Sequence, residues 1–427
     1  MRNSTLPIVR AAALSFAVVV AGAACAAGGD SALAKGPFGK EVAEAVPLIE
    51  KSSGLKFRRP PRIETRSKEQ VRQFVERTFA ESRAAKDVAA SEAVYKRLGM
   101  IPDSLDLRKL QIDVLSEQIA GFYDPKTKVL YVVDGADPTM ASVTVRHELV
   151  HALQDQYLNL DSIQNVEGSD DRAAAAQAVI EGQAVYEQLA SMSTDAGFLD
   201  RIPGGWDRIR QTIRDEQSSM PVLASAPMVI QEELIFPYLS GAEFVRRYKS
   251  QRPGKSPIAD LPQSTEQVLH TEAFFGAHPD APLRVTLPAI TGAKVTYENT
   301  LGEFETRLLL FQHLKDQSAA ARGAAGWGGD RYALVDTPKG QGLVWLSVWD
   351  TPVDAADFAD LMAQAVAHRY SGATASAGAA GASKRWTAGD RTVTLTPADV
   401  GGHAAVLYVD VPTGAATAVD ASKASIQ

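Results

Sequence analysis

Cysteine is almost absent from this sequence: Cys25 is the only one among 427 residues. A single cysteine cannot form a disulfide within the chain, so packing and hydrogen bonding must hold the fold together. Cys25 also lies in an N-terminal segment that has the features of an export signal. Once that segment is removed, no thiol remains for nucleophilic catalysis or for a cysteine-ligated zinc site.

Positive charge is scarce relative to negative charge. The chain has 44 Lys and Arg residues against 51 Asp and Glu residues, which gives a net charge of -7. Such a chain lacks the basic field that attracts a phosphate backbone or an anionic membrane surface, so nucleic acid is not an expected partner. With 45% hydrophobic and 22% charged residues, the composition is that of a globular protein, and the length suits two or three domains.

Long apolar runs are also missing, apart from residues 11–24. This run follows Arg2 and Arg10 and is too short for a comfortable transmembrane helix, so residues 1–34 are predicted to be a signal peptide. The segment ALAK at 32–35 offers cleavage after Ala34. The alternative is AGAAC at 21–25, which loosely resembles a lipoprotein box with a lipid anchor at Cys25. Either processing route predicts an exported protein, periplasmic or secreted, without a transmembrane segment in the mature chain.

Residues 119–157 carry the pattern of a hairpin followed by a helix. The run VLYVV at 129–133 is rich in β-branched residues and is closed by Asp134 and Gly135, which predicts a strand in a hairpin. Asp137 before Pro138 is a helix-start pattern, because Asp caps free amides and Pro suits the first helical position. We therefore expect a helix from about residue 138 to about residue 157.

That helix contains His147-Glu148-Leu149-Val150-His151. Residues four apart project from one face of a helix, so the two imidazoles can bind one metal ion. In the His-Glu-x-x-His pattern the Glu is not a ligand but the base for a metal-bound water. Because histidine is scarce here, the pattern would arise by chance with a probability on the order of 1%.

A catalytic zinc ion needs a third protein ligand and an open position. Glu181 is the favoured candidate, because it lies on an apolar stretch of the next long helix, where a carboxylate needs a partner. Gly182 and Ala184 beside it are small enough to let two helices pack closely. Other carboxylates stay open as alternatives: Asp161, Glu167, Asp170, Asp171 and Glu187.

The order His147-Glu148-x-x-His151, then Glu181-Gly182-Gln183-Ala184 on a second helix, resembles the gluzincin branch of zinc metallopeptidases. The segments RHELVHALQDQ, EGQA, STEQVLH and GWGGDRY also resemble a family of exported bacterial metallopeptidases of unknown substrate. The resemblance implies Zn²⁺ held by His147, His151 and Glu181, with Glu148 as general base in peptide-bond hydrolysis. It also implies an edge strand along the substrate cleft, a place that VLYVVDG fits. The thirty residues between His151 and Glu181 exceed the spacing in thermolysin-like enzymes, so the linker must differ.

Peptide hydrolysis also needs a donor for the developing oxyanion, commonly a His or Tyr further along the chain. His270 in STEQVLHTEAF is the candidate that the resemblance favours, and a purely structural histidine is the alternative. Tyr186 and Tyr238 are weaker candidates, and Tyr186 is expected to point obliquely away from Glu181.

An α+β fold follows from these patterns. A mainly helical, zincin-like catalytic domain with a small sheet is predicted for residues 35–295, and a smaller α+β domain for residues 296–427. In the second domain Trp345, Trp349 and Phe358 are expected in the core, and His313, His368 and His403 lack metal-ligand spacing. GWGGDRY, at 326–332, is interpreted as a turn between a helix and a strand.

The predicted function is an exported zinc peptidase that acts on a peptide or protein substrate. The alternative is an exported binding or structural protein that keeps the fold but is catalytically inactive. Glu148 favours the enzyme, because an inactive relative could keep both histidines and lose the base. A deformylase-like amidase would need a cysteine ligand.

Overall fold

The computed structural model describes residues 37–163, 168–195, 199–201, 205–376 and 383–427. The predicted signal peptide, residues 1–34, and Cys25 lie outside this part of the chain. Across the described ranges, every helix is either too short or too polar to cross a membrane.

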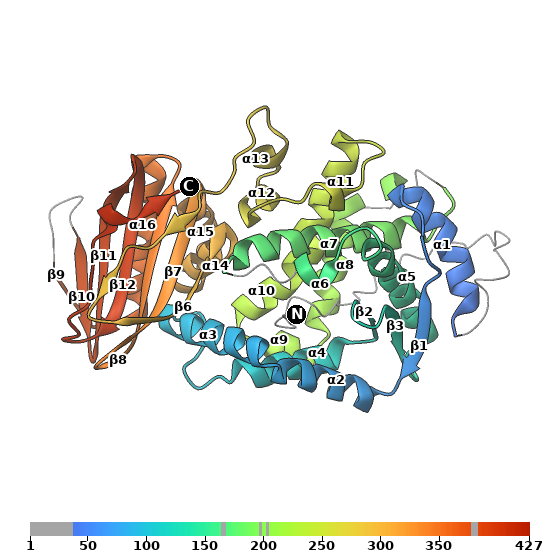
Figure 1. The fold of residues 1–427 in the computed structure, drawn as a ribbon, viewed down its shortest axis with the longest axis horizontal. Coiled ribbons are helices and arrows are strands. Elements are labelled where there is room, and N and C mark those ends of the chain that lie inside the picture. Colours follow the sequence, from blue (N-terminus) through green and yellow to red (C-terminus); the bar gives the residue numbers. More distant parts are fainter. Residues whose placement is uncertain (1–36, 164–167, 196–198, 202–204, 377–382) are drawn as a thin grey trace.

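The α+β class predicted from the sequence is confirmed. Helices make up most of the chain up to residue 275, and a large antiparallel sheet occupies the opposite end of the molecule (Figure 1). The helices of this first part are α1 (Gly39–Ser53), α2 (Lys68–Ala80), α3 (Ser82–Leu98), α4 (Leu107–Gln118), α5 (Pro138–Gln154), α6 (Leu160–Ile163), α7 (Asp170–Ala190), α8 (Gly205–Ser218), α9 (Pro221–Ser225), α10 (Met228–Phe236), α11 (Ala242–Gln251), α12 (Thr265–Leu269) and α13 (Thr271–Phe275). A π-helical turn, η3 (Pro237–Gly241), joins α10 to α11.

A three-stranded sheet lies beside α5, in the order β1-β3-β2. Strand β3 (Val129–Val133) pairs in parallel with β1 (Arg62–Arg66) and antiparallel with β2 (Gly121–Asp124), so the predicted hairpin is present. The expectation that VLYVVDG is the edge strand is wrong, because β3 has a partner on each side and all five of its residues are buried. The edge strand that contacts the metal-motif helix is β2.

Helix α5 begins where its sequence predicts. The Asp137 carboxylate accepts hydrogen bonds from the amides of Thr139 and Met140, at 2.9 and 3.1 Å, and Pro138 occupies the first turn. The second half of the helix is buried almost completely between the small sheet, α1 and α7. A helix buried on every side holds its side chains in fixed rotamers, which a metal or catalytic site requires.

Helix α7 packs unusually close to the η3 turn. A Cβ atom at Gly182 would lie 2.2 Å from the backbone carbon of Gly241, and one at Gly241 would lie 1.9 Å from the carbonyl oxygen of Ala178. No side chain fits at either position, so two glycines in contact let the backbones approach. The expectation that Gly182 serves close helix packing is confirmed.

The C-terminal part is built on a seven-stranded antiparallel sheet, in the order β6-β7-β8-β12-β11-β10-β9. Helices α14, α15 and α16 accompany it, and α16 packs on β8, β11 and β12. The elements are β4 (Val285–Thr286), β5 (Ile290–Thr291), β6 (Lys294–Asn299), α14 (Gly302–Leu314), α15 (Gln317–Ala324), β7 (Trp327–Thr337), β8 (Gly340–Trp349), α16 (Pro352–Arg369), β9 (Thr374–Ser376), β10 (Lys384–Ala388), β11 (Arg391–Val400), β12 (His403–Pro412), β13 (Ala418–Val419) and β14 (Ser425–Ile426). The predicted division at residues 295 and 296 falls inside β6, while β4 and β5 already pair with β14 and β13.

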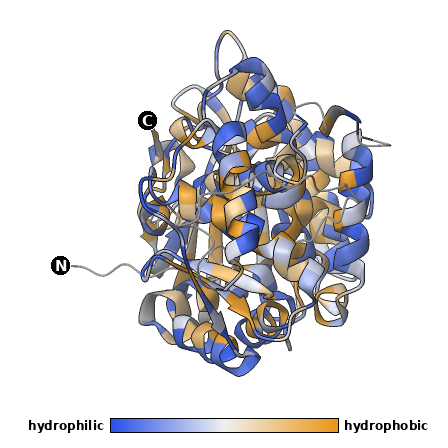
Figure 2. Cartoon of the chain, turned by 90° about the vertical axis from the view of Figure 1, so that its right-hand side faces the viewer, coloured by the Kyte–Doolittle hydropathy of each residue, from blue (hydrophilic) through white to orange (hydrophobic). Residues whose placement is uncertain are grey.

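Three aromatic residues form the expected core between α16 and the sheet. Trp345, Trp349 and Phe358 are each at most 1% exposed, and the Phe358 ring stacks on Trp349 with 4.6 Å between centroids. The largest buried hydrophobic cluster contains residues of both the helical part and the C-terminal part. Hydrophobic residues accordingly concentrate toward the middle of the molecule, with hydrophilic residues toward its rim (Figure 2).

The segment GWGGDRY is not mainly a turn, as the sequence suggested. Only Gly326 turns the chain, with φ of 73°, and β7 already begins at Trp327. In this strand the buried Asp330 carboxylate has hydrogen-bond donors for both of its oxygens. Its carboxylate accepts hydrogen bonds from the amides of Leu301 and Gly302 and from the indoles of Trp327 and Trp345. Asp330 therefore fixes the start of α14 against the sheet.

Candidate metal centre

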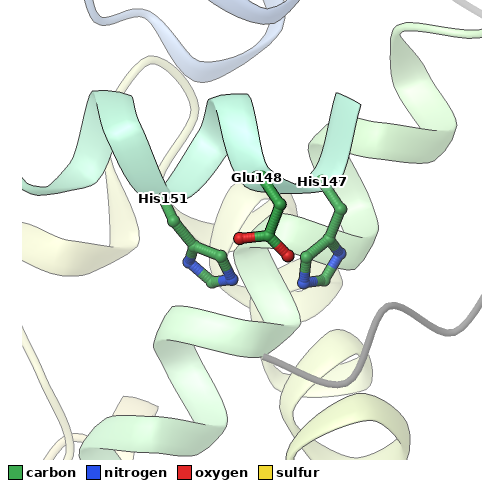
Figure 3. Close-up of side chains that lie close together, drawn as sticks. All are labelled: His147, Glu148 and His151. Atoms are coloured by element: carbon green, nitrogen blue, oxygen red, sulfur yellow. The ribbon is translucent and has the colours of Figure 1, made fainter. Parts of the chain in front are cut away.

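Helix α5 presents its two histidines and the intervening glutamate on one side. His147, Glu148 and His151 point toward a neighbouring helix (Figure 3). One potential ligand atom from each lies within 4.8 Å of the others, and the two imidazole centroids are 4.8 Å apart. All three side chains are buried, with exposures of 0%, 0% and 4%.

Helix α7 brings Glu181 to the same point. Its Oε2 atom lies 3.2 Å from Nε2 of His147 and 3.4 Å from Nε2 of His151. Two carboxylates therefore lie within metal-binding range of the imidazoles. Glu181 is the better ligand candidate, because a single oxygen faces both Nε2 atoms, whereas Glu148 is held by a backbone amide of β2.

The outer nitrogens of the imidazoles are held by glutamine side chains. Nδ1 of His151 lies 2.9 Å from Oε1 of Gln154, whose amide nitrogen donates to the carbonyl oxygen of Ile180. Since that carbonyl only accepts, the Gln154 oxygen must face His151, and Nδ1 must carry the proton. On the other histidine, Nδ1 of His147 lies 3.0 Å from the side-chain amide of Gln188.

This arrangement leaves the Nε2 lone pair of His151 facing Glu181. Nε2 of His151 is buried and has no hydrogen-bond partner among the described residues. A lone pair and a carboxylate oxygen facing one another repel, so a positive species, a proton or a metal ion, must lie between them. Two neutral imidazoles and one carboxylate, each fixed by outer hydrogen bonds, are a donor set that zinc accepts.

Charge and burial act on this cluster in opposite directions. Burial disfavours the carboxylate form of Glu181, but the charge of His151 and the hydrogen bond with His147 outweigh it and lower the Glu181 pKa to about 2. Burial also disfavours the imidazolium form of His151, yet the Glu181 charge raises the His151 pKa to about 9. Without a metal ion, therefore, a proton on His151 supplies the positive charge that the site demands.

Glu148 has a different environment from Glu181. Its Oε2 atom accepts a hydrogen bond of 2.8 Å from the backbone amide of Tyr123 in β2. Burial raises the Glu148 pKa, more than the neighbouring histidines lower it. A carboxyl group with a raised pKa is a stronger base than an exposed one, which is the property a general base near neutral pH needs.

The rival third ligands have other partners. Glu187 pairs with Lys249 at 2.6 Å, and the Asp171 carboxylate accepts from the Thr265 amide at 3.0 Å. Asp161 lies near Lys126 and Lys128, the Asp170 amide donates to the Asn299 side chain at 2.8 Å, and Glu167 lies outside the described part of the chain. Of the described candidates, the structure places only Glu181 against both imidazoles.

The predicted oxyanion donors lie in different places. His270, between α12 and α13, has Nε2 2.8 Å from Oε1 of Glu303, and its side chain is half exposed. Tyr238 in η3 is 2% exposed, and its ring stacks near His147 with 6.2 Å between centroids. Tyr186 instead stacks on Trp206, 6.0 Å away. The sequence favoured His270 over Tyr238 as the oxyanion donor. The structure makes Tyr238 the stronger candidate, because its ring contacts His147 of the motif.

Sequence reasoning missed the three glutamines that support the site. Gln154 and Gln188 hold the histidines, and Gln177 donates a 2.6 Å hydrogen bond to Oε1 of Glu181. A signal existed in the spacing, since Gln154 follows His151 by three residues and Gln177 precedes Glu181 by four, both on one helical face.

Comparison with known proteins gives one match. A family model described as "Domain of unknown function (DUF8575)" matches residues 292–420, which include β6 to β12 and helices α14 to α16. The matched segment does not include His147, Glu148, His151 or Glu181. No curated protein and no solved structure matches the chain.

Proposed function

We propose that this protein is an exported zinc-dependent peptidase. The observation that carries the proposal is the convergence of His147, His151 and Glu181, from two helices, with Nε2 of His151 buried and without a hydrogen bond among the described residues. When zinc is bound, it supplies Lewis acidity to a water molecule and to the carbonyl group under attack.

The chain's own residues supply proton transfer and orientation. Glu148 accepts the proton of the attacking water, for which its raised pKa suits it, and later returns a proton to the leaving amine. The Tyr123 amide fixes the plane of that carboxylate. Gln154 and Gln188 orient the two imidazoles with Nε2 inward, and Gln154 also keeps the proton of His151 on Nδ1.

Strand β2 supports a peptide as the substrate class. It is an edge strand of its three-stranded sheet in the described part of the chain, and its Tyr123 amide is directed at Glu148 instead of at β3. Edge strands bind extended peptides through main-chain hydrogen bonds. A peptide aligned with β2 would therefore run close to the base.

A second candidate is an exported protein in which the same residues hold a metal ion without catalysis. Its support is burial: His147 and Glu148 are 0% exposed. A substrate could reach them only after neighbouring side chains move, whereas a structural metal site needs no such access.

Metal analysis of the purified mature protein, paired with digestion of a peptide library, tests the proposal. The expected result is one zinc ion per chain and cleavage that stops on chelation and returns when zinc is added. Bound zinc without cleavage of any library member would favour the non-catalytic alternative. Absence of bound metal would overturn both.

A further inference from the structure

Three carboxylates meet at a second place, apart from the candidate zinc site. Glu266 comes from α12, Asp280 from the loop after α13, and Asp350 from the junction of β8 and α16. One oxygen atom of each lies within 4.8 Å of the others. The three residues are separated in sequence, so the tertiary fold alone assembles them.

Glu266 is the residue that makes this cluster unusual. It is only 4% exposed, and its Oε2 atom is buried with no hydrogen-bond partner among the described residues. A buried carboxylate oxygen without a partner is costly, because it has lost its hydration and gained nothing in return. Asp280 and Asp350 lie on the solvent side of it, so the cluster is open to an ion from solution.

No basic side chain neutralises the cluster. In the described part of the chain, the structure gives no ion pair and no hydrogen bond for the carboxylate oxygens of Glu266, Asp280 and Asp350. Burial and the charges of Glu303 and Asp280 raise the Glu266 pKa to about 9. Like charges at this separation repel one another, so near neutral pH Glu266 holds a proton unless a cation lies among the carboxylates.

The backbone around the cluster is well fixed. The Asp280 amide donates to the Ala273 carbonyl at 2.7 Å, and its own carbonyl accepts a hydrogen bond from the Gln267 side chain. The Asp350 amide donates to the Gly326 carbonyl at 2.9 Å. These backbone hydrogen bonds therefore hold the three carboxyl groups close together, although negative charges at this distance would repel one another.

We propose that Glu266, Asp280 and Asp350 bind a calcium ion, which joins α12 and the following loop to the C-terminal sheet. All three ligands are carboxylate oxygens, which suit a hard cation and not zinc. Calcium accepts six to eight oxygen ligands in irregular geometry, so solvent molecules can complete the shell on the exposed side. Magnesium demands a near-octahedral set and gives up its water reluctantly.

Calcium binding can be measured directly on the full mature chain. The protein is dialysed against calcium-free buffer, its zinc content is checked to be unchanged, and CaCl₂ is titrated by calorimetry. We expect one calcium ion per chain with a dissociation constant of about 10⁻⁴ to 10⁻³ M, the range of extracellular calcium modules. In 10 mM CaCl₂ the midpoint of thermal unfolding should rise by about 2 to 5 °C, and MgCl₂ at equal ionic strength should raise it less.

Two variants and a matched control make the test specific. Asp350→Asn, at an exposed position, should raise the dissociation constant for calcium at least tenfold, whereas Asp336→Asn, an exposed carboxylate in β7, should leave it unchanged. Glu266→Gln should remove the calcium response and, in calcium-free buffer at neutral pH, unfold at a temperature close to that of the wild type, because Glu266 is protonated there and Gln replaces it with a neutral group of the same size.

Several results would overturn the proposal. The first is a wild-type protein that shows neither heat of binding nor a higher unfolding temperature in 10 mM CaCl₂. The second is an equal rise of the unfolding temperature in MgCl₂. The third is an unchanged calcium response in Asp350→Asn. None of these readouts depends on peptidase activity, so the calcium site and the proposed peptidase function fail or succeed separately.

Discussion

The backbone amide of Tyr123 donates a 2.8 Å hydrogen bond to Oε2 of Glu148. This bond joins the edge strand β2 to the residue of α5 with the proposed role of general base. It also separates the two carboxylates of the site, since Glu148 is anchored by the sheet and Glu181 by the imidazoles. The two residues therefore respond differently to substitution.

Glu148→Gln should keep zinc and lose hydrolysis. The amide can still accept the Tyr123 hydrogen bond and both imidazoles stay in place, but the base is gone, so turnover should fall by about 10²- to 10⁴-fold. Zinc content and turnover are measured on the same preparation. Full activity in this variant would rule out Glu148 as the base.

Glu181→Ala should lose zinc. Removal of the carboxylate that faces both Nε2 atoms should weaken zinc affinity by more than the about 10- to 100-fold typical of an outer-shell change. Asp170→Ala, at the start of the same helix, is the control and should bind zinc as the wild type does. If Asp170→Ala or Glu187→Ala loses zinc while Glu181→Ala retains it, the third ligand is wrongly assigned.

Gln154→Ala should weaken zinc binding without removal of a ligand. Its side chain holds the Nδ1 proton of His151, so its loss should lower zinc affinity by about 10- to 100-fold. Gln156→Ala, two residues further on, removes a side chain that bonds the backbone of Arg58 and Arg59 instead, and serves as the control. Competition with a zinc-binding dye measures both, and equal affinities would contradict the role of Gln154.

Tyr238→Phe should lower turnover by about ten- to a thousandfold, with zinc retained and KM little changed. This is the pattern expected when an oxyanion donor is removed, and Tyr238 is the predicted donor with a ring next to His147. His270→Ala is assayed in parallel, because the sequence favoured His270. A loss of turnover confined to His270→Ala would return the role to His270, and unchanged turnover in both would exclude both.

The His270 and Glu303 pair should make stability depend on pH. The hydrogen bond that His270 donates to the Glu303 carboxylate raises the His270 pKa. A group with a raised folded pKa stabilises the fold below its unfolded pKa, near 6.5, and this contribution is lost as pH rises through the folded pKa. The stability of the wild type relative to His270→Gln should therefore be greater at pH 5.5 than at pH 9.

Urea unfolding at the two pH values measures this difference. His278→Gln, at an exposed histidine nearby, is the control and should show no such change. A wild-type advantage that is the same at both pH values would mean that the charge of His270 does not contribute.

The sequence by itself determined the local features of this protein. Asp137 and Pro138 start α5 where predicted, and Ser67 and Gln70, three residues apart, form the capping box of α2. These features depend on residues three or four positions apart, which the helix geometry relates directly. Helix geometry likewise places His147 and His151 on one face. The α+β class follows from the hydrophobic periodicity of the segments.

Only the tertiary structure decided which distant residues meet. Of the five described carboxylate candidates it brought Glu181 to both imidazoles, and it placed β2 instead of β3 at the sheet edge and Tyr238 beside His147. It also assembled Glu266, Asp280 and Asp350 from three separate elements. Such contacts depend on the order of the strands and on how closely helix backbones approach, as at Gly182 and Gly241. The spacing of residues along the sequence does not predict them.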